Sequence, residues 1–154
     1  MLNPKATFSS MVVAATLISP GWAANSAGSH PGYVQALSDL RAAHWMLTHQ
    51  TGDARVYDDE KVALNEVDAA IGEIKNASID DGQSLNDHPN VDVSEHGSRL
   101  LRSMEILHKA QADIRGEGEK PDVKELRTRA NHHIDLAIQA ADRAHTAWLK
   151  DNKK

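Results

Sequence analysis

Apolar residues recur along the chain in four stripes with the four-and-three spacing of amphipathic α-helices. The first stripe includes a histidine and consists of Tyr33, Leu37, Leu40, His44 and Leu47. The second consists of Leu64, Val67, Ile71, Ile74 and Ser78. The third consists of Gly97, Leu100, Met104, Leu107, Gln111 and Ile114. The fourth is rich in alanine and consists of Leu126, Ala130, His133, Ala137, Ala141, Ala144 and Trp148. The pattern predicts four helices.

Local signals mark where these helices begin and end. Pro31 and Pro121 are each suited to the first turn of a helix, and the Asp92-x-x-Glu95 motif resembles a capping box. Connections of about 5 to 10 residues favour antiparallel neighbours. We therefore predict an all-α fold, an antiparallel up-down-up-down four-helix bundle over residues 30–150, followed by a polar tail at 151–154.

The first 23 residues have the three-part layout of a cleavable signal peptide. Lys5 gives a positive n-region, residues 11–18 (MVVAATLI) form the apolar h-region, and Gly21-Trp22-Ala23 is a small-x-small cleavage pattern. Eight apolar residues are too few to span roughly 30 Å of hydrocarbon, and no later segment forms a membrane span. We expect cleavage after Ala23, a short linker at 24–29, and a periplasmic or secreted protein.

Composition narrows the chemistry that this chain can perform. The sequence has 154 residues, no cysteine and a net charge of −5, which becomes more negative once Lys5 is removed. An acidic chain is a poor partner for nucleic acid, and the lack of cysteine excludes thiolate metal sites, covalent haem and thiol catalysis. There is no GxSxG motif, no HExxH motif and no glycine-rich phosphate loop. The sequence therefore favours a protein that is not an enzyme.

Nine histidines are the main candidates for chemistry. An up-down-up-down bundle would gather imidazoles and carboxylates from four segments at one end, and Zn²⁺, Cu²⁺ or Ni²⁺ would suit such ligands. The candidate metal ligands are His30, Asp81, Asp87, His88, His96 and His145. The alternative is that this end is simply a solvated one, where Asp80, Asp81 and Asp92 cap helices and form turns.

His44 and His133 lie on apolar stripes and are predicted core histidines. A haem or a metal between them would need both at one level, whereas an up-down-up-down bundle separates them by roughly 10 Å along its axis. A neutral imidazole bonded to a carbonyl or carboxylate oxygen is the favoured state for each.

Long stretches of the chain resemble an uncharacterised family of small exported bacterial helical-bundle proteins. The resemblance rests on HPGYVQALSDLRAAHW, EVDAAIGEIK, IDDGQSLNDHPNVD and HHID, and it extends from His30 to about His145. It implies a small secreted helical fold, and it brings no activity, cofactor or site residue with it.

Two functional hypotheses follow from the residues. The first is an exported bundle that binds or buffers a divalent metal through the histidines and aspartates at one end. The second is a non-enzymatic structural or interaction module of the cell envelope that binds an envelope protein through exposed apolar residues, for which the candidates are Trp45, Val62 and Trp148.

Overall fold

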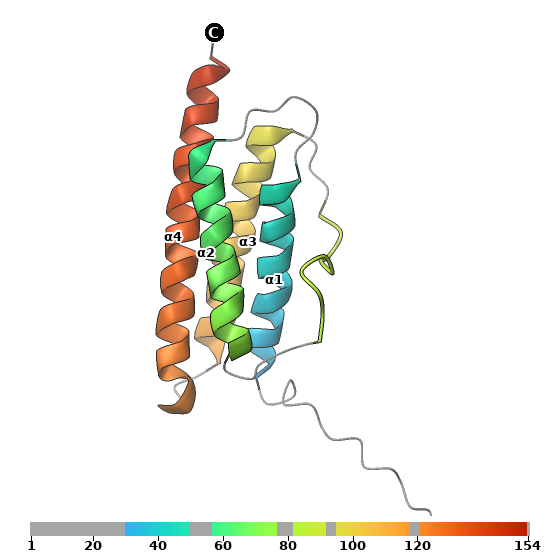
Figure 1. Ribbon diagram of the computed structural model, residues 1–154, viewed down its shortest axis with the longest axis vertical. Helices are drawn as coiled ribbons and strands as arrows, with labels where there is room; N and C mark the ends of the chain where they lie inside the picture. Colours follow the sequence, from blue (N-terminus) through green and yellow to red (C-terminus); the bar gives the residue numbers. More distant parts are fainter. Residues whose placement is uncertain (1–29, 50–56, 77–81, 92–94, 118–120, 154) are drawn as a thin grey trace, which may run out of the picture.

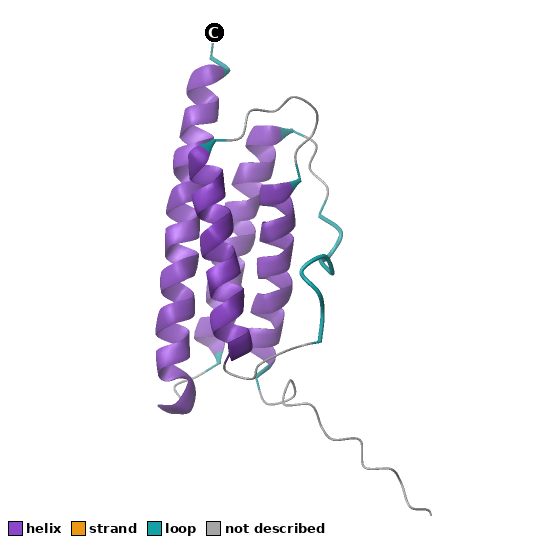
Figure 2. Cartoon of the chain, in the orientation of Figure 1, coloured by secondary structure: helices purple, strands orange, loops and turns teal. Residues whose placement is uncertain are grey.

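The computed structural model describes residues 30–49, 57–76, 82–91, 95–117 and 121–153. Its helices are α1 (Pro31–Thr48), α2 (Asp58–Asn76), α3 (His96–Gly116) and α4 (Pro121–Asp151), and the described residues contain no strand (Figures 1 and 2). The predicted all-α four-helix bundle is confirmed. The predicted signal peptide and linker lie outside the described residues, as do Asp80, Asp81 and Asp92.

The four apolar stripes meet in one core, which is why these segments fold as helices. Leu37 of α1, Val67 of α2, Leu107 of α3 and Ile134 of α4 are all fully buried within it. The alanines of the α4 stripe are buried as well, and such small side chains let neighbouring helices approach closely. None of the described helices has the length and apolar character needed to cross a lipid bilayer.

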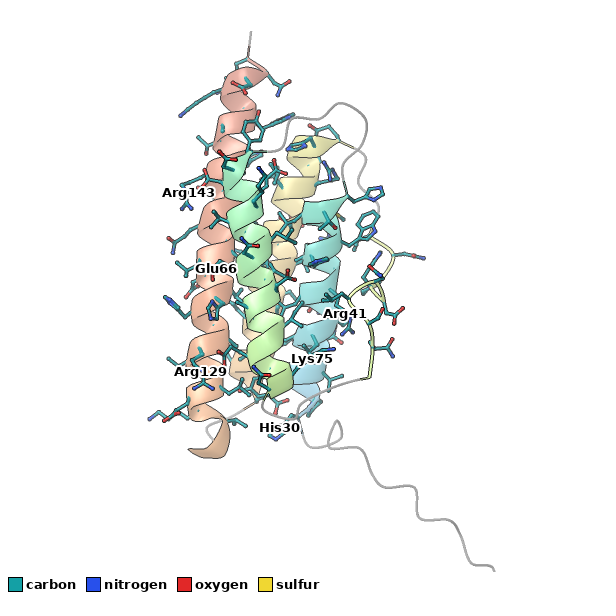
Figure 3. The ribbon with its side chains drawn as sticks, in the orientation of Figure 1. His30, Arg41, Glu66, Lys75, Arg129 and Arg143 are labelled. Carbon is teal, nitrogen blue, oxygen red and sulfur yellow. The ribbon has the colours of Figure 1, made fainter. Side chains whose placement is uncertain are left out.

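The bundle is antiparallel as predicted, because every packed pair of helices runs in opposite directions, but the predicted up-down-up-down order along the chain is wrong. The start of α2 lies beside the start of α3, where Glu60 Oε1 is 3.0 Å from His96 Nε2. The end of α2 lies beside the start of α4, where Arg129 bonds Glu73 (Figure 3). Helices α1 and α4 therefore run one way and α2 and α3 the other, so the order is up-down-down-up (Figure 1).

This order changes which helices are neighbours. α1 packs against α2 and α3, and α4 packs against the same two helices, so α1 is diagonal to α4 and α2 is diagonal to α3. The described part of the connection between α2 and α3, residues 82–91, lies beside α1 (Figure 1). We call residues 82–91 the crossover segment.

The physical reason lies in the length of that connection. A helix of about 19 residues is about 28 Å long, whereas the chain between Asn76 and His96 could cover roughly twice that distance when extended. The turn-forming residues 82–91 are only part of this connection, which is longer than the predicted 5 to 10 residues. A connection this long does not force its two helices to be antiparallel.

Two glycines allow helices to approach closely at opposite ends of the bundle. A Cβ atom on Gly97 would overlap the indole ring of Trp148, so the end of α4 rests on the start of α3. A Cβ atom on Gly32 would overlap the backbone oxygen of Asp113 and the side chain of Glu117. Both close contacts are possible because glycine has no side chain.

Carboxylates cap the starts of two helices. Glu95 is the N-cap of α3 and accepts hydrogen bonds from the backbone N–H groups of Gly97 and Ser98. Glu117, just after α3, accepts hydrogen bonds from Gly32 N–H and from His30 Nδ1, and so caps α1 from another helix. Both carboxylates satisfy N–H groups that a helix leaves without intrahelical partners.

Candidate functional site

The predicted metal ligands do not meet at one end of the bundle. His30 lies at the end where α1 begins (Figure 3), and its Nδ1 is 3.2 Å from Glu117. His96 lies at the opposite end, buried against Glu60. His145 stacks on Trp148 late in α4, and Asp87 and His88 lie on the crossover segment beside α1. The expected convergence is therefore wrong, because it depended on the up-down-up-down order.

Within the part of the chain that the structure describes, no three histidine, aspartate or glutamate side chains are placed to hold a metal ion. Asp81 lies outside that part. Metal binding stays a prediction, since single imidazoles remain accessible on the surface.

His133 hydrogen-bonds a carboxylate and His44 lies near one, but the prediction that both are core histidines is wrong, because both are partly exposed beside helix α2. His44 Nε2 is 3.5 Å from Asp68, and His133 Nδ1 is 2.7 Å from Glu66. Both carboxylates belong to α2, on which the two imidazoles converge from different neighbouring helices. The predicted 10 Å offset rested on the wrong helix order, since α1 and α4 run in the same direction.

A buried polar network joins three helices at the end where α3 begins. Arg99 donates one N–H to the carbonyl oxygen of Met46 and another to His96 Nδ1, at 3.1 and 3.0 Å. Because a guanidinium only donates, His96 Nδ1 accepts, and the Nε2–H of this neutral imidazole donates to Glu60. Burial lowers the pKa of Arg99, and the charge of Glu60 opposes that shift. This network holds the helix ends together, and its buried groups do not form an open site.

An open groove runs between α1 and the crossover segment, and we call it the α1 groove. A hollow of about 580 Å³ occupies one part of it and is lined by Val34, Gln35, Ser38, Arg41, Gln83, Asp87 and His88. A second hollow of about 490 Å³ continues it and is lined by Trp45, His49, His88, Asn90 and Val91. His88 lines both hollows, so together they form one continuous surface.

The floor of the groove is a second stripe on α1, next to the core stripe. Val34, Ser38, Arg41 and Trp45 follow one another at four, three and four residues, which places them on one helix face. Because α1 is anchored in the core by its neighbouring stripe, this floor is held rigidly.

Two contacts hold the wall of the groove against its floor. Arg41 is almost fully buried, and its Nε–H donates to the carbonyl oxygen of Asp87 at 2.6 Å (Figure 3). Farther along, His88 packs against Trp45 with ring centroids 4.9 Å apart. The crossover segment is thus fixed to α1 at a polar contact and at an aromatic one.

The crossover segment also has a fixed local shape. Asp87 accepts a hydrogen bond from the Ser84 N–H, and this bond, with smaller contributions from Arg41 and His88, lowers the pKa of the Asp87 carboxyl. His88 Nδ1 lies 2.8 Å from the carbonyl oxygen of Pro89. Since a carbonyl only accepts, Nδ1 is the donor of this hydrogen bond.

Trp45 forms the aromatic part of the groove. The His49 ring stacks on the indole with centroids 4.2 Å apart and planes 13° from parallel, while His88 lies against it at 39°. Two imidazoles, the indole and the side chains of Asn90 and Val91 line the second hollow, which we call the Trp45 pocket. Of the predicted exposed apolar residues, Val62 is 42% exposed, whereas Trp45 and Trp148 are partly covered.

Sequence reasoning identified Asp87 and His88 as candidate metal ligands and Trp45 as a candidate partner contact, but it missed the rest of this site. The missed signal is the second stripe on α1, where Val34, Ser38 and Arg41 precede Trp45. That stripe becomes informative only when the crossover segment is known to lie over it.

Comparisons of the chain with protein-family models, with curated proteins and with solved structures give no match. The α1 groove and the polar network are therefore interpreted from their own chemistry.

Proposed function

We propose that the protein is a non-enzymatic binding module of the bacterial cell envelope, and that it binds a protein partner through the α1 groove. The observation that carries this proposal is the groove itself, with a floor anchored in the core and a wall fixed by the Arg41–Asp87 and Trp45–His88 contacts. Binding sites are typically preformed concave surfaces with a few well-placed polar groups. The predicted export signal supports the envelope location.

Three hydroxyl groups outside the groove serve their own helices. Thr48, Ser103 and Thr128 each donate a hydrogen bond to a carbonyl oxygen of their own helix. The groove itself offers amides, imidazoles, the Ser38 hydroxyl and the Arg41 guanidinium, which suit recognition.

Photo-crosslinking in intact cells tests this proposal. A photoreactive amino acid is placed at Gln35 on the floor or at Gln83 on the wall, and the control position is Asp142, which is exposed on α4. We expect one cross-linked partner from both groove positions, none from the control, and loss of the product in Trp45→Ala. Equal labelling from all three positions, or no product from the groove, would contradict the proposal.

Divalent metal binding is the competing proposal, and it needs its own test. Equilibrium dialysis of the protein against Zn²⁺, Cu²⁺ and Ni²⁺, repeated with His30→Ala and His88→Ala, measures it directly. Because these two histidines lie in different parts of the bundle, we expect only weak binding, reduced independently by each substitution. Tight binding of one ion per chain, abolished by either substitution, would favour the metal site over the groove.

A further inference from the structure

We infer that the α1 groove binds an extended peptide segment of about five residues, with an apolar side chain of that segment in the Trp45 pocket. This inference rests on the proposed function and names the kind of partner. It follows from the shape of the groove, the placement of its amide groups, its charge balance and its aromatic end.

The shape of the groove is linear. Its floor runs from Val34 to Trp45, eleven residues apart on α1, which is about 16 Å at 1.5 Å per residue. An extended peptide rises about 3.3 Å per residue, so about five residues cover this length. A compact small molecule would leave one of the two hollows empty.

Amide side chains lie on both sides of this line. Gln35 is on the floor beside the first hollow, and Asn90 is on the wall of the second. Each primary amide offers both a donor and an acceptor. That combination matches the alternating N–H and C=O groups of an extended backbone, which must keep its hydrogen bonds when it leaves water.

The charges in the groove are already balanced. Arg41 donates to the backbone of Asp87 and interacts electrostatically with its carboxylate, which also accepts from the Ser84 N–H. The chain as a whole is acidic, at −5. A neutral peptide backbone therefore fits this surface better than a phosphate or another anion.

The Trp45 pocket supplies the side-chain specificity. Trp45, Val91 and the rings of His49 and His88 surround it, and Val91 is itself packed on the core. Binding is favoured when an apolar group covers aromatic and apolar walls, because both surfaces are then removed from water. A leucine or phenylalanine of the partner therefore suits the pocket.

Binding of defined peptides to the purified protein tests the inference. The probes are peptides with the sequence Gly-Ser-X-Ser-Gly, uncharged ends and an uncharged fluorescent label, in which X is Gly, Leu, Phe, Lys or Glu, and fluorescence anisotropy gives the affinity. We expect X = Leu and X = Phe to bind about tenfold or more tightly than X = Gly, since each buries an apolar side chain. The peptides with X = Lys and X = Glu should bind no more tightly than the peptide with X = Gly.

Variants separate the pocket from the backbone contacts. Trp45→Ala should reduce the preference for Leu over Gly to less than about threefold, whereas Trp45→Phe should retain most of it. N-methylation of the serine amides in the peptide should weaken binding about tenfold, because it removes backbone donors. The protein variant Asp142→Ala, on the exposed face of α4, should bind like the wild type.

The outcomes distinguish this inference from the proposed function. Cross-linking through Gln35 and Gln83 without any binding of the peptides would overturn the inference while the binding module stands. Tight binding of all peptides regardless of X, or binding insensitive to N-methylation, would also overturn it. Peptide binding without a cross-linked partner in cells would instead contradict the proposed function.

Discussion

Gly97 lies beneath the indole ring of Trp148, where α3 begins and α4 ends. In the Gly97→Ala variant the new Cβ atom would overlap ring carbons of Trp148, so the indole or the helix end must move. We expect a loss of about 1 to 3 kcal/mol in the free energy of unfolding, which is typical of overpacking. Urea denaturation followed by circular dichroism measures this difference.

Gly72 provides the matched control, because it also lies in a helix but has open space around its Cα atom. Gly72→Ala should stabilise the protein by up to about 1 kcal/mol through helix propensity alone. Equal effects of the two substitutions would show that the contact between Gly97 and Trp148 is not formed in solution.

Glu95 gives a prediction about pH. Its hydrogen bonds to Ser98 lower the pKa of its carboxyl below the ordinary value of 4.5. A carboxyl whose pKa is lowered by folding stabilises the protein above that ordinary value, and the stabilisation is lost as pH falls through the lowered pKa. Because Glu95 is largely exposed, Glu95→Gln should cost only about 0.5 kcal/mol at pH 7.

Urea denaturation at pH 7 and at pH 3 checks this prediction. The difference between Glu95→Gln and the wild type should shrink at the lower pH, where the carboxylate gains protons. A difference that grows as the pH falls would contradict the assignment of Glu95 as a charged N-cap.

At the scale of elements, Arg99 joins three helices. Its two terminal nitrogens bond the last turns of α1 through Met46 and the start of α2 through His96 and Glu60. Arg99→Met leaves these acceptors unsatisfied and the buried Glu60 without a cation, so we expect a loss of about 2 to 4 kcal/mol. Chemical denaturation at pH 7 measures it.

Arg99→Lys tests whether the forked geometry matters. An ammonium on a single stem keeps the charge but does not reproduce the planar fork that bonds two acceptors at once. We therefore expect lysine to recover no more than half of the lost stability. Full recovery would show that charge alone, and not the bridge between helices, accounts for the effect.

The helices themselves could be predicted from the sequence. The stripes containing Leu37, Val67 and Leu107 face the core, as their spacing indicates, and Pro31 begins α1. On α4 the alanines of the predicted stripe are buried, but Ile134 is buried where His133 was predicted. Glu95 was assigned to a capping box, whereas it is the cap itself. Such details depend on backbone angles near the helix start, which residue types alone do not determine.

At the scale of the whole molecule, the order of helix directions could not be predicted in the same way. Local spacing determines which face of a helix is apolar, but it does not determine which other helix covers that face. The long connection between Asn76 and His96 leaves both helix orders accessible. His30 and His96 lie at opposite ends of the bundle because of the helix order that the protein adopts.

The candidate site depends on the same order of helix directions. Asp87 and His88 were recognised as chemically interesting, but their neighbours Arg41 and Trp45 belong to a helix more than forty residues earlier in the chain. Only the return of the crossover segment along α1 brings these residues together. Because the site forms where two segments that are distant in the sequence lie side by side, no local sequence motif predicts it.

The groove between α1 and residues 82–91 is the central claim, and a cysteine cross-link tests it most directly. The chain contains no cysteine, so the double variant Ser38→Cys with Gln83→Cys carries only the two introduced thiols, which line the same hollow. The control double variant combines Gln83→Cys with Asp142→Cys, since α4 is diagonal to α1. A short bismaleimide should link the first pair within one chain and leave the control unlinked, as measured by peptide mapping with mass spectrometry. Linkage of the control, or no linkage of the first pair, would contradict the placement of the crossover segment on α1 and the groove that depends on it.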